Sequence, residues 1–436
     1  MAENMKKIEI LVAARVEGSE IDHAACVRAG PWLFLTGIEA TDYANGLASA
    51  VRARAGLPHH GRPKHRREAD FIVGRFAQML ELAGSSFAHS VRVDQYYTTW
   101  KAVDSYHHAR KAAFGAHIPP STSIVMHELL GREFDISASL IAVRPGCGLD
   151  PQRVAAPKIG APAWSGFAPA LACGDLVFIA GQMARAADGA HDPRAHVSPH
   201  SLWGGYEIRK QAEHIINESL APAIEAAGSS FANAVKAQAY VRYIEDVPHL
   251  LQVWDSYFGE RKVALTIVPA VEFGHVSANL EINLIALRDA GTIRKEIVLA
   301  DVPEECCFGA PAVRAGDLLF LSGLHAADRE GPVGGLRTAS TFPYFGIAPR
   351  AQMRFVLEQA DKLCAASGSS LANVVRAQHF LTDLGHFPGV HRVWQERLGN
   401  CPLPFSAVRV PVPQAVPDCS LTLDLWIYSP RGSLSS

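Results

Sequence analysis

The sequence predicts an α+β protein built from three tandem copies of one small module, because two different sequence markers each occur three times in the same order. The first marker is an apolar run that follows a Gly-Asp or Gly-Pro turn and closes with Gly37, Gly181 or Gly323. The second is a Gly-Ser-Ser tripeptide that begins at residues 84, 228 and 368. Both markers recur about every 140 residues, which is the length of a small domain.

The boundaries of the copies follow from composition. A turn-rich stretch, Pro145-Gly146-Cys147-Gly148, ends the first copy, and a charged stretch from Arg288 to Glu305 separates the second copy from the third. We therefore predict domains over residues 1–146, 147–290 and 291–436.

Each copy is expected to begin with a buried strand and to continue, after a variable loop, with a helix. In the third copy the strand is the apolar run Leu318–Leu321, which follows a Gly-Asp turn. Met353, Val356 and Leu357 begin an i, i+3, i+4 pattern typical of a helix with one buried face. Gly368 lies just beyond this pattern and is expected to end the helix.

The second half of each copy is expected to hold three more strands and one more helix. In the third copy, residues 374–381 are strand-like, and Val393, Trp394 and Leu398 have helical spacing. Two strands, residues 406–410 and 421–428, close the copy. The predicted order is β-(β)-α-β-α-β-β, with the helices on one face of a mixed sheet. The other face needs cover, which the other two copies can supply.

Composition and charge argue against several classes of function. The chain has 436 residues, is 48% hydrophobic and 19% charged, and carries a formal net charge of −2. The small net charge and the absence of a long basic run do not favour a nucleic-acid partner. No run approaches 18 apolar residues, so we expect no membrane span and no membrane partner. Eight sparse cysteines without a Cys-x-x-Cys pair favour reduced thiols and a cytoplasmic location.

Neither a cofactor nor a metal is expected. The sequence lacks a Gly-x-Gly-x-x-Gly fingerprint, a P-loop and a Gly-x-Ser-x-Gly elbow. Two histidine-rich loops have neither helical i, i+4 spacing nor a cysteine partner, so we predict no zinc site in them. Their histidines are His59, His60 and His65 in the first copy, and His191, His196 and His200 in the second.

The recurring motifs resemble those of the YjgF/RidA (Rid) superfamily. The resemblance rests on the run from Gly174 to Gly181 and its two counterparts, on the Gly-Ser-Ser helix end, and on a second helix that contains Trp or Tyr. It spans all three copies. Rid proteins are mostly homotrimers with a chorismate-mutase-like fold, in which sheets pack inside, helices lie outside and a small-molecule site forms at each subunit interface.

The resemblance therefore implies a self-contained pseudo-trimer with three non-identical clefts between its domains. The chorismatases, which are single-chain proteins of the same kind, are a related precedent. The sequence does not decide whether two such pseudo-trimers associate into a dimer. The partner implied is a small-molecule substrate.

One position departs from the family pattern in every copy. The family grips a substrate carboxylate with an arginine in a Pro-Ala-Arg-[Ser/Thr] motif, because the guanidinium fork matches a carboxylate. Here the aligned residue is Ser121, Leu265 or Phe405. Imine deamination through that arginine is therefore not expected, although Ser121 remains a candidate substrate-binding residue.

Glu281 is the best candidate for a catalytic acid or base. The family's last strand carries a glutamate that faces the ligand, and only the second copy keeps it. Its neighbours Leu280 and Ile282 point to the opposite face of the strand. The alternative interpretation is an ion-paired or solvated strand carboxylate.

Four further side chains are acid–base candidates. The position on the second helix at which the family offers an asparagine to the ligand aligns with His107, Leu251 and His391. An imidazole suits proton transfer near neutral pH. Shortly after the glycine that closes the first strand, Glu39 and His325 are the corresponding candidates. For all four, a side chain that faces solvent is the alternative.

The remaining substrate-binding candidates lie on or before the first strand. Glycine lets a ligand approach the backbone closely, and glycines close this strand in all copies, at Gly37, Gly181 and Gly323. Gln182 matches the family's usual residue after that glycine. An aromatic position before the strand in the family corresponds to His23, Phe167 and Phe308.

We expect a cofactor-independent hydrolase that acts on a small polar metabolite at an inter-domain cleft. The reaction would be water addition or C–N bond cleavage, related to the hydrolysis of imines and enamines by Rid proteins. One alternative is a chorismatase-like hydrolase or lyase for an enol-ether carboxylate, which needs an Arg or Lys in the cleft, such as Arg409. The other is a non-catalytic ligand-binding or chaperone-like scaffold. Nothing in the sequence favours a ribonuclease.

Overall fold

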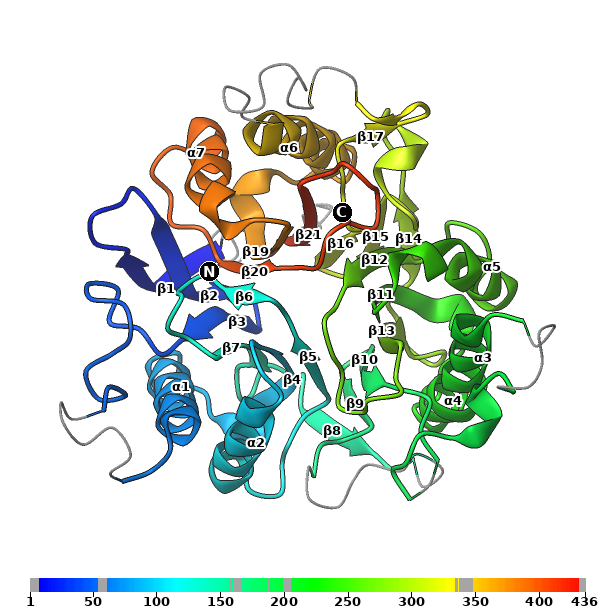
Figure 1. Cartoon of the computed structure of the whole chain (residues 1–436), viewed down its shortest axis with the longest axis horizontal. Helices are drawn as coiled ribbons and strands as arrows, with labels where there is room; N and C mark the ends of the chain where they lie inside the picture. Colours follow the sequence, from blue (N-terminus) through cyan, green and yellow to red (C-terminus); the bar gives the residue numbers. More distant parts are fainter. Residues whose placement is uncertain are drawn as a thin grey trace, which may run out of the picture.

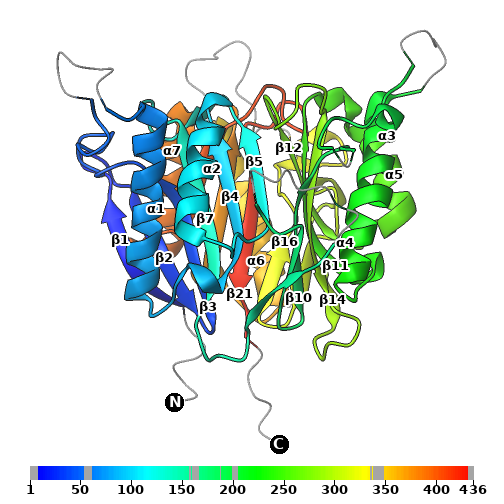
Figure 2. The same cartoon turned by 90° about the horizontal axis from the view of Figure 1, so that it is seen from below.

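The computed structural model describes residues 8–53, 61–156, 159, 166–186, 188–198, 205–333, 336 and 348–430. These residues form three units that follow one another along the chain and surround a common axis (Figure 1). The sheets face the axis, and the helices lie on the outside (Figure 2). The predicted α+β class with three tandem units is confirmed.

The first unit is a six-stranded sheet covered by two helices. Its strands lie in the order β1-β2-β3-β7-β4-β5. Neighbours are antiparallel except β4 and β5, which run parallel because a helix connects them. In chain order the elements are β1 (Ile8–Arg15), β2 (Asp22–Ala29), β3 (Trp32–Glu39), α1 (Lys64–Leu82), β4 (Ser90–Tyr97), α2 (Lys101–Phe114), β5 (Ser121–Val125), β6 (Glu128–Leu129) and β7 (Ile136–Val143).

The second unit repeats this topology in the order β8-β9-β10-β13-β11-β12. Its first helix contains a π-helical turn over Ile215–Leu220, next to Pro222, which cannot donate a backbone hydrogen bond. The elements are β8 (Pro151–Val154), β9 (Ala170–Cys173), β10 (Leu176–Gln182), α3 (Glu207–His214), α4 (Ala221–Ala226), β11 (Ala234–Val241), α5 (Val247–Phe258), β12 (Ala264–Pro269) and β13 (Leu280–Leu287).

The third unit has the order β14-β15-β16-β21-β19-β20, and β6 of the first unit pairs with β20 at its edge. Its last parallel strand begins at Phe405, one residue before the predicted start. The elements are β14 (Lys295–Val298), β15 (Ala312–Ala315), β16 (Leu318–Leu321), the short pair β17 (Ala327–Asp328) and β18 (Gly331–Pro332), α6 (Ala348–Ala366), β19 (Val374–Leu381), α7 (Phe387–Leu398), β20 (Phe405–Arg409) and β21 (Leu421–Tyr428).

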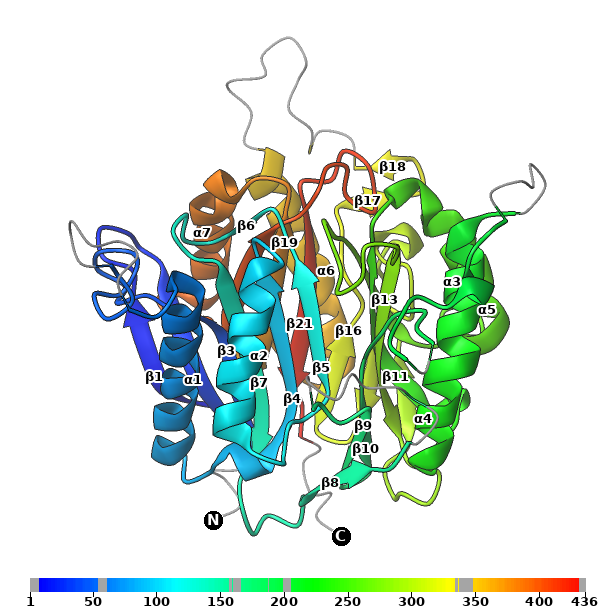
Figure 3. The same ribbon diagram turned by 60° about the horizontal axis from the view of Figure 1, so that its bottom comes forward.

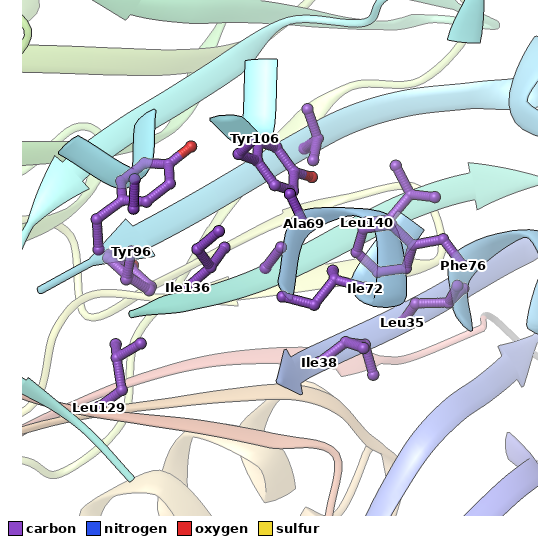
Figure 4. Close-up of a cluster of buried hydrophobic side chains, with 14 of the residues drawn as sticks. Leu35, Ile38, Ala69, Ile72, Phe76, Tyr96, Tyr106, Leu129, Ile136 and Leu140 are labelled. Carbon is purple, nitrogen blue, oxygen red and sulfur yellow. The ribbon is translucent and has the colours of Figure 1, made fainter. Parts of the chain in front are cut away.

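Apolar side chains fill the space between each sheet and its helices. Figure 4 shows this layer in the first unit, where Ile72 and Phe76 of α1 meet Leu35 of β3 and Leu140 of β7. All four side chains are fully buried. Burial of the helix face against the sheet is the main source of stability for such a layer.

A fourth core lies on the axis and is shared by all three units. Phe34, Phe178 and Phe320 occupy the same position in β3, β10 and β16, and all three belong to this core. Trp426 of β21 packs edge-on against Phe34 and Phe320, with ring centroids 6.4 and 4.7 Å away. Both faces of each sheet are therefore covered, which explains why β21 is buried along its whole length.

Charged side chains also meet on the axis. The carboxylate of Asp94 accepts hydrogen bonds from Arg92 Nε at 3.0 Å and from Arg376 Nη2 at 2.6 Å. Lys236 Nζ lies 2.8 Å from Asp424 Oδ2. None of these five side chains is more than 2% exposed. The Asp94–Arg376 pair joins the first unit to the third, and the Lys236–Asp424 pair joins the second to the third.

Candidate active site

A pocket of about 520 Å³ opens between the first and second units. Its walls come from α2 and β5 of the first unit and from β10, β13 and residues 272–276 of the second. Figure 3 shows β5 beside β10 at this interface. The backbone N–H of Val125 donates to the carbonyl of Glu272 at 3.1 Å and so ties the two walls together.

Five residues predicted from the sequence are brought together in this pocket. The catalytic candidates among them come from β13 and α2, and the substrate-binding candidates from β5, β10 and the segment before β9. They are Glu281, His107, Ser121, Phe167 and Gly181.

Glu281 lies in the deep part of the interface and is 3% exposed. Its position in β13 is fixed by pairing with Tyr240 of β11. Burial raises the pKa of Glu281 to about 7, while the charge of Arg185 and the backbone N–H of Ser123 act to lower it. Its Oε2 atom is buried without a hydrogen-bond partner. The carboxyl group is therefore able to gain and lose a proton near neutral pH.

Gly181 makes room for this carboxyl group. A Cβ atom at residue 181 would overlap Oε1 of Glu281. The register of β10 against β13 also shifts between Ile179 and Gln182, so a β-bulge turns the strand at this glycine. The glycine is thus needed for the position of the carboxylate, whatever its role toward a ligand.

A Cβ atom at residue 181 would displace the carboxyl group of Glu281. If Glu281 acts on a substrate in this pocket, we expect Gly181→Ala to lower kcat/KM for that substrate by about 100-fold, because displacing a reacting group by about 1 Å has an effect of that size. Gly74→Ala is the control, since nothing lies within 4 Å of a Cβ added at that helical glycine. Turnover per folded molecule is the measurement. Equal activities of the two variants would contradict the placement of Glu281.

Arg185 is a pocket residue that the sequence reasoning missed. Arg185 lines the pocket; its Nη2 atom lies 3.9 Å from the Sδ atom of Met183, and its Nε atom is buried without a hydrogen-bond partner. Burial lowers the pKa of Arg185, and the nearby Glu281 partly offsets this. Its backbone is held by a bridge to His191 and by donation from its N–H to the carbonyl of Met183 at 2.8 Å.

The corresponding positions in the other units carry no charge. Arg185 lies four residues after Gly181, and the residues four after Gly37 and Gly323 are Thr41 and Ala327. All three make the same backbone hydrogen bond to the residue two before them. The strand position of Glu281 holds Ser137 in the first unit and Thr422 in the third. At these two repeat positions, a cation and a carboxyl group therefore occur together in the second unit alone.

His107 and Ser123 form the wall contributed by the first unit. His107 Nε2 lies 3.4 Å from Ser123 Oγ, which donates to Gln95 Oε1 at 2.7 Å. Burial, followed by the charge of Arg110, lowers the pKa of His107 well below its ordinary value. His107 is therefore a neutral imidazole at pH 7. Ser123 was not predicted, and it is recognisable only once β5 is known to face the interface.

Aromatic side chains occupy the interface between the third and first units. Phe405 lies where the pocket has Ser121, with its ring 4.8 Å from His23 and 5.7 Å from His391. A Cβ at Gly37 would overlap the Phe405 carbonyl. His391 is 2% exposed, and its Nε2 accepts a hydrogen bond from the backbone N–H of Asp22 at 3.4 Å. The predicted residues Gly37, His23 and His391 thus meet each other here, away from Glu281.

The interface between the second and third units holds Leu265 together with Phe308 and His325, whose rings lie 5.0 Å apart. Leu265 takes the place of Ser121 and is 1% exposed. The N–H of Gly323 donates to the Leu265 carbonyl at 3.2 Å, so the two strands touch directly. His325 lies against Thr422, with Nδ1 and Oγ1 3.4 Å apart, and burial lowers the pKa of His325 to about 3.

Gln182 and Glu39 lie outside the walls of the pocket. Gln182 turns back on its own strand, where its Nε2 donates to the carbonyl of Ala180 at 3.3 Å. Glu39 is buried at the end of β3, paired in register with Ser137. Burial raises the pKa of Glu39 to about 8, and the charge of Glu68 acts in the same direction.

The raised pKa of Glu39 predicts that the stability of the folded protein depends on pH. The folded state keeps this proton up to a pH of about 8, whereas the unfolded chain loses it near pH 4.5. Its contribution to stability is therefore full below pH 4.5 and is lost as the pH rises toward 8. We expect the Tm of Glu39→Gln, relative to the unchanged protein, to rise steadily from pH 5 to pH 8. A difference in Tm that does not vary with pH would show that Glu39 is solvated.

The described residues contain neither a metal-binding cluster nor a membrane-spanning helix. Among them, no cluster of three or more His, Cys, Asp or Glu side chains is arranged to hold a metal ion. His59, His60 and His200 lie outside the described residues. Within the same ranges, no helix is both long enough and apolar enough to cross a membrane.

The fold and the pocket define a class of protein: tandem α+β units around one axis, with a ligand-sized pocket where two units meet. The family model of endoribonuclease L-PSP matches residues 158–288 and 307–421, which together are more than half of the chain. The chain therefore belongs to this family, that is, to the Rid superfamily that the sequence motifs indicate.

Several solved structures match parts of the chain. The yeast protein YEO7 is 21% identical, with a TM-score of 0.26, over 32% of this chain and 98% of its own. A Rid-family protein of unknown function, YyfA from Yersinia pestis, is 18% identical, with a TM-score of 0.27, over 31% and 98%. A chorismatase is 17% identical, with a TM-score of 0.42, over 63% and 78%. No curated protein matches the chain significantly.

Proposed function

We propose that this chain is a cofactor-independent hydrolase that cleaves the carbon–nitrogen bond of a small carboxylate in the pocket between the first and second units. One observation carries the proposal: Arg185 and Glu281 line the same pocket. A guanidinium binds a carboxylate with two parallel hydrogen bonds. Arg185, from the second unit, would thus bind the carboxylate of the substrate. Ser121, which occupies the family's arginine position, has no guanidinium with which to do so.

Glu281 would serve first as the proton acceptor and then as the proton donor. As a carboxylate it accepts a proton from water while the water oxygen bonds to the imine carbon. As an acid it returns that proton to the nitrogen, which gives a carbinolamine. It then takes the proton of the new hydroxyl group and passes it to the nitrogen, so that the C–N bond breaks, ammonia leaves and the carbonyl group forms. One water is consumed, and one oxo acid and one ammonia are formed. A pKa of about 7 suits both steps, since a group that titrates near the working pH serves as base and then as acid.

His107 would assist without carrying a charge. Its low pKa keeps the imidazole neutral, so it can exchange hydrogen bonds with a substrate or with water but does not compete with Arg185 for the carboxylate. Its contact with Ser123 at 3.4 Å orients the ring toward β5.

The test uses imines of 2-amino acids, generated in the assay by an amino acid oxidase, with release of the 2-oxo acid followed over time. We expect Arg185→Gln to lower kcat/KM by about 10- to 100-fold, mostly through KM, because a hydrogen bond to a charged group contributes about 1.5–3 kcal/mol. Arg397→Gln, at a surface ion pair with Asp361 on α6, is the matched control. If no imine is consumed faster with the protein than without it, the imine hydrolase proposal fails, and a non-catalytic binding scaffold takes its place if chorismate is not consumed either.

A second candidate is a chorismatase-like activity on an enol-ether dicarboxylate. It is favoured by the presence of two arginines, Arg185 and Arg242, in the walls of the pocket. Arg409, considered from the sequence, instead pairs with Glu128 at 3.0 Å at the edge of the third sheet. Incubation with chorismate and an assay for pyruvate distinguishes this candidate from imine hydrolysis.

We also propose a cytoplasmic location. None of the eight cysteines, all of which lie in the described residues, is in a disulfide, and Cys147 and Cys401 are exposed as thiols. Exposed thiols suit a reducing compartment.

A further inference from the structure

The mouth of the pocket carries apolar side chains that are open to solvent. Trp100, from the first unit, is 59% exposed, and Val276, from the second, is 82% exposed. Both line the pocket. Because they belong to opposite sides of the interface, a ligand that touches both would bridge the two units. Apolar side chains exposed beside a pocket are typical of a surface that a ligand covers.

Ordered backbone holds both side chains in place. Trp100 immediately precedes α2, and its carbonyl accepts a hydrogen bond from the N–H of Val103 at 3.1 Å. Arg242 Nη1 donates to the carbonyl of Val276 at 2.9 Å, and the guanidinium lies 6.0 Å from the centre of the Phe273 ring. Arg242 is thus a positioning residue for the segment that bears Val276. The apolar mouth is a built feature of the interface.

The apolar character continues into the pocket. Val103 and Val125 of the first unit and Phe167 and Met183 of the second also line it. The volume of about 520 Å³ lies within the range of about 300–1,000 Å³ that is usual for drug-sized ligands. An acid of three or four carbon atoms would leave most of this apolar wall uncovered.

We propose that the ligand is an amphipathic acid, with its carboxylate at Arg185 and an aromatic or branched aliphatic group against Trp100 and Val276. The carboxylate end rests on the proposed function, and the apolar end is new. Short polar acids are then poor ligands, because they leave the side chains of Trp100 and Val276 exposed to water. Trp100 and Val276 are then the residues that set specificity.

The test compares two inert acids that share a head group, 3-phenylpropionate and propionate, by equilibrium titration. We expect the phenyl acid to bind at least about tenfold tighter, as burial of one ring predicts. Trp100→Ala and Val276→Ser should bring this ratio close to one without changing the affinity for propionate. Arg185→Gln should weaken both acids by the same factor. Leu299→Ser, at an equally exposed apolar residue outside the pocket, should change neither.

The outcomes separate this inference from the proposed function. Equal affinities for the two acids, or a ratio that survives both substitutions at the mouth, would overturn the apolar end of the proposal. Binding of neither acid would overturn it entirely. Imine hydrolysis is measured separately, so its absence counts against the reaction and leaves the ligand class standing.

Discussion

Glu281→Gln is expected to lower kcat/KM for imine hydrolysis by about 10²- to 10⁴-fold, the usual contribution of a positioned acid or base. The amide keeps the size of the side chain and fits the space beside Gly181, so the fold should be retained. It neither accepts a proton from water nor returns one to nitrogen. Glu225→Gln, at an exposed glutamate on α4, is the control and should leave kcat/KM unchanged.

The pH profile adds a readout that a structural role would not move. In the free protein the Glu281 carboxyl has a pKa of about 7, so the carboxylate fraction falls as the pH drops below that value. The logarithm of kcat/KM should therefore rise with pH up to about 7 and then level off, and the Gln variant should lack this limb. If Glu281→Gln keeps both the value of kcat/KM and its rise with pH, Glu281 has no part in the reaction.

Asp94→Ala is expected to reduce the free energy of unfolding by about 3–5 kcal/mol, because removing one partner leaves the others as buried charges without compensation. Asp94 is 2% exposed and binds two arginines, Arg92 and Arg376, from different units. The loss should appear in denaturant unfolding as a lower midpoint. The same substitution should also weaken the association of the first unit with the third.

Asp70→Ala provides a matched control for this effect. Asp70 also binds two arginines, Arg62 at 2.7 Å and Arg66 at 2.8 Å, but its side chain is 33% exposed. Water screens such a surface pair, so we expect a loss of about 0–1 kcal/mol. Similar losses in the two variants would mean that the axial charges are hydrated and that the three units do not close tightly on the axis.

The fold was predictable because its signals are local and occur three times. Each marker falls at a turn whose conformation depends on glycine; Gly368, for example, has φ near +70°. The strands that precede the Gly-Asp turn were not singled out. β8 and β9 are four residues long, and the burial of β8 is only partial, so their sequences lack a strong alternation of apolar and polar residues.

The site was predictable only in part, for a physical reason. Strand alternation tells which residues share a face, but both faces of every sheet are covered in this fold. Strand alternation therefore does not separate Glu39 from Glu281, and it is the family pattern that ranks Glu281 first; Glu39 is buried within its own unit, whereas Glu281 lines a pocket. Arg185 was missed because the family pattern directs attention to the position of Ser121. The signal that reveals it is the contrast among Thr41, Arg185 and Ala327 at one repeat position.

The central claim is that one of three equivalent interfaces carries the chemistry. It is tested most directly by turnover per folded molecule of three alanine variants at a single structural position: Ser137→Ala, Glu281→Ala and Thr422→Ala. We predict that kcat/KM collapses in Glu281→Ala and stays within about threefold of the unchanged protein in the other two, since charge at this position is confined to Glu281. Retained activity in Glu281→Ala, together with a collapse in either of the others, would contradict the account.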